Sequence, residues 1–231
     1  MKNLDLAKDG TGTVMEDKIN WLFFDLGSTL VDETDVYKSR CDYAINEKKL
    51  NRDEFMEKVR EMAETSATAI FAVAKFYGVT LPPWNNSLEK LYPETPAVLE
   101  KLAQKYKLGI IANQVEGTQK RIDNWGIGKY FDVVVASAEA GVAKPDSAIF
   151  KIALEKAGCK PENAVMIGDR LDNDIIPAKK LGMKTIWVRQ ALAVYQKVRN
   201  DEEQPDFTID SIREITEVLL KKIRIEHEQN F

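Results

Sequence analysis

Histidine and cysteine are scarce in this chain. Its 231 residues include one histidine, His227, and two cysteines, Cys41 and Cys159, which lie far apart. A Ser-His-Asp triad, a Cys-His pair and a zinc site built from several histidines all need residues that the sequence lacks. The cysteines form no CxxC metal motif and imply no disulfide framework. An enzyme with this sequence must draw its chemistry from carboxylates, lysines and bound ions.

The chain also lacks long apolar runs and a strong charge of either sign. The longest apolar candidate, residues 67–79, is interrupted by Lys75 and is too short to cross a bilayer. Lysine and arginine number 33 against 37 aspartates and glutamates, a net charge of −4, whereas nucleic-acid binders carry a basic stripe. We therefore expect a globular protein with neither a nucleic-acid nor a membrane partner, and its oligomeric state is left open.

Residues 1–18 are expected to form a flexible leader before the folded chain. They lack the apolar h-region of a secretory signal, and Met15 is a candidate internal start. Cytoplasmic residence is the default expectation.

From residue 19 onward, short β-rich runs alternate with longer helical ones. Six continuous apolar runs are typical of strands buried on both faces, namely 21–26, 108–112, 132–137, 164–168, 184–188 and 206–209. Helix-like periodicity marks the stretches between them at 95–106, 118–127, 147–158 and 174–182. Repeated strand–helix–strand units predict an α/β fold with a doubly wound, Rossmann-like parallel sheet.

Residues 27–107 interrupt this alternation because they contain no strand pattern. Segment 36–78 is helical instead, with Asn51 capping its second helix and Gly78 closing its third. The simplest interpretation is a helical cap, residues 35–92, inserted into an α/β core made of residues 19–34 and 93–231. The alternative is that these helices merely cover the same core.

Polar residues follow four of the predicted strands. Ligands bind at the carboxyl ends of strands in an open parallel sheet, so these side chains should meet in one crevice. Several carboxylates in one crevice repel each other unless a cation lies among them, and Mg²⁺ is the natural occupant. A lysine there would offset charge on a phosphoryl group, and a carboxylate could act as a covalent nucleophile. The residues are Asp25, Asn113, Gln114, Lys144, Asp169, Asp172 and Asp174.

Four motifs in order, with a helical insert after the first, resemble the haloacid dehalogenase-like hydrolase superfamily. They are FFDLGSTL, LGIIANQ, GVAKPD and IGDRLDND. The insert is similar in position to the cap of the subgroup whose helical cap lies between the first two motifs. The resemblance implies a Mg²⁺-dependent phosphatase of a small phosphorylated metabolite, working through an aspartyl-phosphate. Dehalogenases and phosphonate-cleaving enzymes are minorities of the superfamily.

The resemblance also implies roles for individual residues. Asp25 matches the nucleophile and is a metal ligand together with the backbone carbonyl of Gly27. Lys144 matches the lysine that orients the nucleophile and the phosphate. Asp169 matches the direct metal carboxylate, and Asp174 the second, often water-mediated one. The residues expected to bind substrate are Ser28, Asn113 and Gln114.

Two positions depart from the family pattern. Gly27 stands where phosphatases of the family usually carry a second aspartate, which protonates the leaving oxygen and then activates water. Losing a general acid–base costs about 10²–10⁴-fold in rate. Ala112 stands where the pattern has Ser or Thr to hold the phosphate. Asp32 and Glu33, at the hinge to the cap, are candidate replacement acids, although solvated hinge residues are the plainer interpretation.

Three hypotheses follow from these departures. The first is a phosphatase that uses another acid or acts on substrates whose leaving group needs little protonation. The second is a dehalogenase-type hydrolase acting at carbon, which does not require Mg²⁺; the presence of both Asp169 and Asp174 argues against it. The third is an inactive relative that binds a phosphorylated ligand or a protein. The motifs favour the first.

Overall fold

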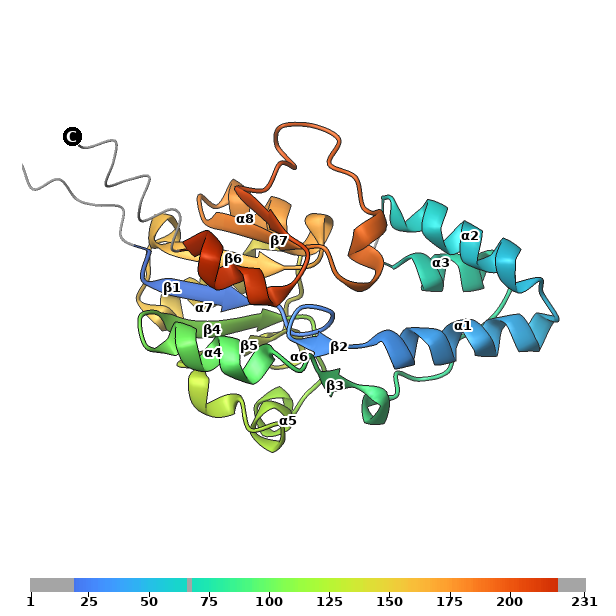
Figure 1. Ribbon diagram of the computed structural model, residues 1–231, viewed down its shortest axis with the longest axis horizontal. Coiled ribbons are helices and arrows are strands. Elements are labelled where there is room, and N and C mark those ends of the chain that lie inside the picture. Colours follow the sequence, from blue (N-terminus) through green and yellow to red (C-terminus); the bar gives the residue numbers. More distant parts are fainter. Residues whose placement is uncertain (1–18, 66–67, 220–231) are drawn as a thin grey trace, which may run out of the picture.

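The computed structural model describes residues 19–65 and 68–219, and a six-stranded parallel sheet forms its centre (Figure 1). The strands lie in the order β5-β4-β1-β6-β7-β8. The predicted leader, residues 1–18, lies outside the described residues. The strands are β1 (Trp21–Phe24), β4 (Lys107–Ala112), β5 (Val133–Ala136), β6 (Ala164–Gly168), β7 (Lys184–Val188) and β8 (Phe207–Ile209).

Helices cover both faces of this sheet, so the side chains of β1 are buried alternately on one face and on the other. Leu22 and Phe24 join a hydrophobic cluster that includes side chains of α4 and α5. Trp21 and Phe23 join a second cluster, with side chains of α7 and α8. The predicted doubly wound α/β sheet is therefore confirmed. The core helices are α4 (Thr95–Ala103), α5 (Thr118–Asn124), α6 (Ser137–Ala140), α7 (Ser147–Ala157) and α8 (Ile176–Lys180).

The strand order reverses direction at β1. The chain runs from β1 outward through β4 to β5 and then returns to the other side of β1 for β6, β7 and β8. Phe24 pairs with Ile110 on one side and Ile167 on the other, and the amide of Asp25 donates to the carbonyl of Ile167 at 2.8 Å. The segments that follow β1 and β6 therefore leave the sheet side by side, where parallel sheets bind ligands.

A helical unit interrupts the core between β1 and β4. Helices α1 (Thr34–Lys48), α2 (Arg52–Ala63) and α3 (Ala69–Phe76) surround a hydrophobic cluster of their own, separate from the clusters of the sheet. The cluster includes Phe55 and Val59. We refer to α1–α3 as the cap. Its division from the core at residues 35 and 92 stays a prediction.

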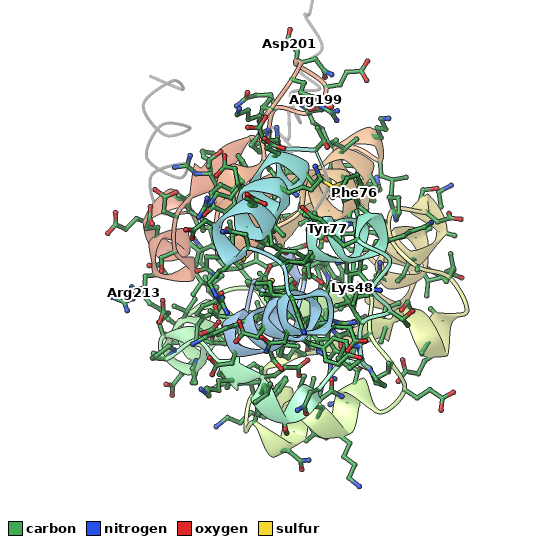
Figure 2. All side chains as sticks on the ribbon, turned by 90° about the vertical axis from the view of Figure 1, so that its right-hand side faces the viewer. Lys48, Phe76, Tyr77, Arg199, Asp201 and Arg213 are labelled. Carbon is green, nitrogen blue, oxygen red and sulfur yellow. The ribbon has the colours of Figure 1, made fainter. Side chains whose placement is uncertain are left out.

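The start of α2 and the end of α3 have the features that the sequence predicts. The side chain of Asn51 accepts the amides of Asp53 and Glu54 at the start of α2, and Gly78 has φ +66° just after α3. Figure 2 looks onto the cap, with Lys48 at the end of α1 and Phe76 and Tyr77 at the end of α3 facing the viewer. None of the described helices is both long and apolar enough to cross a membrane.

Two short features were not expected from the sequence. An antiparallel pair, β2 (Val31–Asp32) with β3 (Lys90–Leu91), joins the two chain segments that lead into and out of the cap. A π-helical turn (Leu171–Ile175) precedes α8, where Pro177 lies in the first turn and has no N–H to continue an α-helical ladder. The remaining turns are 3₁₀: η1 (Asn86–Leu88), η2 (Gly128–Tyr130), η3 (Pro161–Asn163), η5 (Ala191–Tyr195) and η6 (Ile212–Glu214).

Candidate active site

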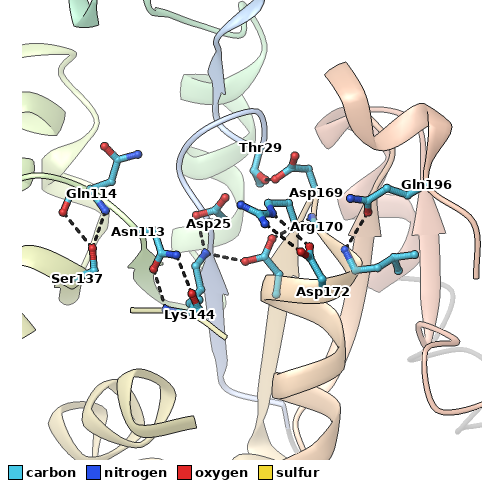
Figure 3. Close-up of polar contacts among 12 residues, drawn as sticks. Asp25, Thr29, Asn113, Gln114, Ser137, Lys144, Asp169, Arg170, Asp172 and Gln196 are labelled. Carbon is cyan, nitrogen blue, oxygen red and sulfur yellow. Dashed lines mark hydrogen bonds and ion pairs between the residues drawn. The ribbon is translucent and has the colours of Figure 1, made fainter. Parts of the chain in front are cut away.

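A buried lysine joins two carboxylates at the carboxyl ends of β1 and β6 (Figure 3). The Nζ atom of Lys144 lies 2.7 Å from Oδ1 of Asp25 and 2.6 Å from Oδ1 of Asp174. Lys144 is 4% exposed, Asp25 is 7% exposed and Asp174 is fully buried. Asp25 follows β1, Lys144 lies in the loop before α7, and Asp174 lies in the π-helical turn. Folding thus brings three distant segments to one point.

Asp169 adds a third carboxylate, immediately after β6. One carboxylate oxygen each of Asp25, Asp169 and Asp174 lies within 4.8 Å of the others, and all three residues are buried. The ammonium of Lys144 bonds two of them, whereas the carboxylate of Asp169 has, among the described residues, one partner, the Thr29 hydroxyl at 3.5 Å. Three carboxylates therefore share one ammonium, and this donor set of hard oxygens fits a divalent cation.

The electrostatics of the cluster reflect this excess of negative charge. Burial, together with the charges of Asp25 and Asp174, raises the pKa of Asp169 well above its usual range. Burial raises the pKa of Asp174 to about 6, although the attraction of Lys144 opposes the rise. Burial lowers the pKa of Lys144, but the two carboxylates outweigh it and the pKa is raised. The lysine therefore stays charged, and the negative charge of the carboxylate cluster exceeds the single positive charge of the lysine.

The side chains of Asn113 and Gln114 are hydrogen-bonded within the protein. Nδ2 of Asn113 donates to the carbonyl of Lys144 at 2.9 Å, and its Oδ1 accepts the Lys144 amide at 2.7 Å. Oε1 of Gln114 accepts from Arg121. Asn113 thus holds the backbone of the loop that carries Lys144. The predicted substrate-binding role of both residues stays a prediction.

A buried carboxyl group, that of Glu33, packs against the turn after Asp25. Ser28, which has φ +55°, donates from Oγ to Oε2 of Glu33 at 2.8 Å, and the Tyr37 hydroxyl donates to the same oxygen at 3.0 Å. Glu33 is 6% exposed. Burial raises its pKa to about 7, against the opposing effect of the two hydrogen bonds. The plainer expectation of a solvated hinge residue is therefore wrong for Glu33.

Asp32, the other candidate acid, has a different environment. It is half-buried, and its Oδ1 accepts the backbone amide of Thr34 at 2.9 Å, at the start of α1. This contact is that of a residue ordering a helix start.

Sequence reasoning missed two residues of the site. Thr29 is next to the predicted Ser28 in the first motif, and its position there was the available signal. Tyr37 lies four residues after Glu33, one turn along the start of α1, so helical spacing could have paired them. Ala112, the last residue of β4, is fully buried, and its side chain supplies no hydroxyl.

A cavity lies between the cap and the core. Its volume is about 390 Å³, and Tyr37, whose hydroxyl contacts Glu33, forms part of its wall. Most of the other lining side chains are apolar, and two are cationic, Lys38 and Arg52. The apolar lining comes from α1, α2, α3 and the η5 turn and includes Cys41, Met56, Val59, Ile70 and Leu192.

Comparison with known proteins gives a consistent result. The family model of the haloacid dehalogenase-like hydrolases matches residues 22–188. A glyceraldehyde 3-phosphate phosphatase of Methanopyrus kandleri is 39% identical over 56% of this chain and 57% of that protein. The chain therefore spans little more than half the length of this relative. A glyceraldehyde 3-phosphate phosphatase of Pyrococcus abyssi is 31% identical over 74% of this chain and 82% of that protein.

A solved structure shares the fold. The crystal structure of a HAD phosphatase from Thermococcus onnurineus aligns with 87% of this chain and 97% of its own, with a TM-score of 0.59 and 24% sequence identity.

Proposed function

Because this chain belongs to the haloacid dehalogenase-like hydrolase family, we propose that it is a Mg²⁺-dependent phosphatase acting through an aspartyl-phosphate on Asp25. The observation that carries the proposal is the shared ammonium of Lys144, which bonds one oxygen of Asp25 in a cluster of three buried carboxylates. Relatives named as phosphatases support the same reaction class.

Asp25 is suited to act as a nucleophile. Lys144 holds its Oδ1, and Oδ2 has no hydrogen-bond partner among the described residues. One carboxylate oxygen is thus oriented while the other is available to attack phosphorus. In the reaction, Oδ2 forms the new P–O bond, and the bond from phosphorus to the leaving oxygen breaks.

The ammonium of Lys144 lies where charge would accumulate. A phosphoryl group bonded to Asp25 adds negative charge beside a cluster that already has three carboxylates for one ammonium. The residues that would hold Mg²⁺ are Asp25, Asp169, Asp174 and the carbonyl of Gly27. When bound, Mg²⁺ would stabilise the negative charge of the phosphoryl oxygens.

The cavity between cap and core has room for the remainder of a small substrate. Its volume of about 390 Å³ falls in the range of small-ligand sites, and its lining is mainly apolar. Lys38 adds positive charge to its wall, and Arg52, also in the wall, is paired with Asp42. We infer that the substrate is a small phosphorylated metabolite whose leaving group enters this cavity.

The central experiment is a phosphatase screen with added Mg²⁺, run with Asp25→Asn beside the wild type. The asparagine keeps the shape of the side chain but is not a nucleophile, so turnover should vanish while the circular dichroism spectrum is unchanged. Asp172→Asn is the matched control. Asp172 lies in the same motif as Asp169 and Asp174, but it pairs with Arg170 and is outside the three-carboxylate cluster. Full turnover by Asp25→Asn would refute the nucleophile assignment.

The dehalogenase hypothesis can be tested in parallel. Halide leaves carbon without needing a proton, and that reaction does not depend on Mg²⁺. Chloride release from 2-chloropropionate in the presence of EDTA would favour it over the phosphatase. We expect no chloride release, because a cluster of three carboxylates exceeds what that reaction needs.

A further inference from the structure

The space beside Gly27 that a side chain at this position would occupy is filled by Glu33. Gly27 stands two residues after Asp25, and its φ lies outside the left-handed region, so the backbone conformation would accept a side chain. A β-carbon on Gly27 would lie 2.4 Å from Oε1 of Glu33 and 2.8 Å from its Cδ and Oε2. The carboxyl group of Glu33 therefore occupies the place where a side chain at residue 27 would begin.

The two oxygens of the Glu33 carboxyl group have different surroundings. Oε2 accepts both hydroxyl hydrogen bonds, from Ser28 at 2.8 Å and from Tyr37 at 3.0 Å. Oε1 has no hydrogen-bond partner among the described residues, and it is the oxygen nearest the β-carbon position of Gly27. An oxygen that accepts two hydrogen bonds is a poor site for the proton of a neutral carboxyl group. A proton on this carboxyl group would therefore lie on Oε1, the oxygen that faces the turn after Asp25.

We propose that Glu33 is the general acid and base of this enzyme, placing a carboxyl group from the start of α1 where family members place one from residue 27. The proposal rests on the phosphatase function proposed above. It reverses the consequence drawn from Gly27 alone, because the chain keeps an acid at that point in space while losing it at that point in sequence.

The reaction proceeds in two steps. Oδ2 of Asp25 bonds to phosphorus, the bond from phosphorus to the leaving oxygen breaks, and the proton on Oε1 of Glu33 passes to that oxygen. The alcohol leaves, and Glu33 is now a carboxylate. It then takes a proton from water, whose oxygen bonds to phosphorus while the bond to Asp25 breaks. Inorganic phosphate leaves, and Glu33 is protonated again.

The first test is Glu33→Gln, assayed with Mg²⁺ on a series of aryl phosphates and on an alkyl phosphate. Glutamine keeps the shape and can still accept the Ser28 and Tyr37 hydroxyls through its carbonyl oxygen, but it cannot give up a proton. Hydrolysis of the alkyl phosphate should fall about 10²–10⁴-fold in kcat. Release of p-nitrophenolate should show a burst of one equivalent per active site, because the first step needs little protonation and the second still needs a base.

Asp32→Asn is the matched control. It removes the neighbouring carboxylate, which orders the start of α1, and should leave both the alkyl rate and the burst behaviour as in the wild type. Equal losses on aryl and alkyl substrates in Glu33→Gln, with no burst, would reduce Glu33 to a positioning residue. Unchanged rates would remove it from the mechanism.

A second test moves the carboxyl group back to residue 27. Gly27→Asp alone should be poorly active, since its β-carbon would collide with the Glu33 carboxyl group. Glu33→Ala opens that space and should lose alkyl hydrolysis, and Glu33→Ala/Gly27→Asp should recover at least 10-fold of it. No recovery in a folded double variant would overturn the proposal. A wild type inactive on every phosphate would instead overturn the phosphatase function itself.

Discussion

The ammonium group of Lys144 is buried and is shared by two carboxylates. Its Nζ bonds Asp25 and Asp174 at 2.7 and 2.6 Å. Removing one partner from a buried ion pair leaves an uncompensated charge, which costs about 3–5 kcal/mol. The lysine is therefore expected to stabilise the fold, in addition to the role proposed for it in the reaction.

Lys144→Met should accordingly lower the free energy of unfolding by about 3–5 kcal/mol in EDTA. Methionine keeps most of the length of the side chain and removes the charge. Added Mg²⁺ should recover part of the loss, because a divalent ion supplies the missing positive charge to the same carboxylates. Urea unfolding followed by circular dichroism measures both values. A loss below about 1 kcal/mol, the usual value of a surface pair, would contradict the burial argument.

Asp169 is predicted to behave in the opposite way. Its carboxylate is buried, repelled by two others and left without the lysine. Asp169→Asn should therefore raise the melting temperature of the metal-free protein, by about 2–4 °C for each kcal/mol of relieved repulsion. The same change should abolish the rise in melting temperature that Mg²⁺ gives the wild type. Calorimetry with EDTA and with Mg²⁺ tests both, and Asp172→Asn serves as the control.

At this scale the sequence predicted the carboxylate cluster but not the position of Glu33. Asp25, Asp169 and Asp174 could be placed together because they follow strands, and strand ends of a parallel sheet converge. Glu33 precedes a helix, where an acidic residue is typically solvated. That its carboxyl group lies under Gly27 depends on Ser28 in the left-handed region and on contacts across the turn, and neither has a periodic signature in sequence.

At the scale of elements, the six core strands lie where buried apolar runs predict them, two with identical bounds: β6 at 164–168 and β7 at 184–188. Continuous apolar runs suffice for this because both faces of the sheet are covered. The β2–β3 pair could not be predicted, since strands of two residues have no measurable alternation. The π-helical turn likewise depends on two shifted backbone hydrogen bonds before Pro177, from the amides of Ile175 and Ile176 to the carbonyls of Arg170 and Leu171.

The cap of α2 offers a test of local stability. Asn51 accepts two backbone amides at distances of 2.9 and 3.1 Å. Asn51→Ala should therefore destabilise the protein by about 1 kcal/mol, with activity retained. Asn46→Ala is the matched control, because Asn46 is exposed on α1 and caps nothing; its effect should stay within about 0.5 kcal/mol. Equal effects of the two variants in urea unfolding would exclude the capping role.

At the scale of the whole molecule, the described residues form hydrophobic clusters on each face of the sheet and another inside the cap. Phe55 in the cap cluster and Phe150 under the sheet are both fully buried. Such a division predicts that damage in one cluster stays there, because local stability follows local packing.

Replacing each phenylalanine by alanine tests this division. Either change should cost about 3–5 kcal/mol in the unit that contains it. In Phe55→Ala, hydrogen exchange should accelerate in α1–α3 and leave β1, β4 and β6 protected. In Phe150→Ala, hydrogen exchange should instead accelerate in the sheet. Acceleration across the whole sheet in Phe55→Ala would show that cap and core unfold as one unit.

The β2–β3 pair has a consequence for the timing of the reaction. Glu33 lies directly after β2 and directly before α1, so it would move with α1 in any rotation about this pair, whereas Asp25 directly follows the sheet strand β1. Any swing of α1–α3 away from the sheet would break the hydrogen bond from Ser28 to Glu33 and withdraw the proposed proton donor from Asp25. The reaction would then proceed only while the cap is closed over the substrate. In an open enzyme, water would reach the proposed phosphoaspartate in the absence of the base proposed to activate it.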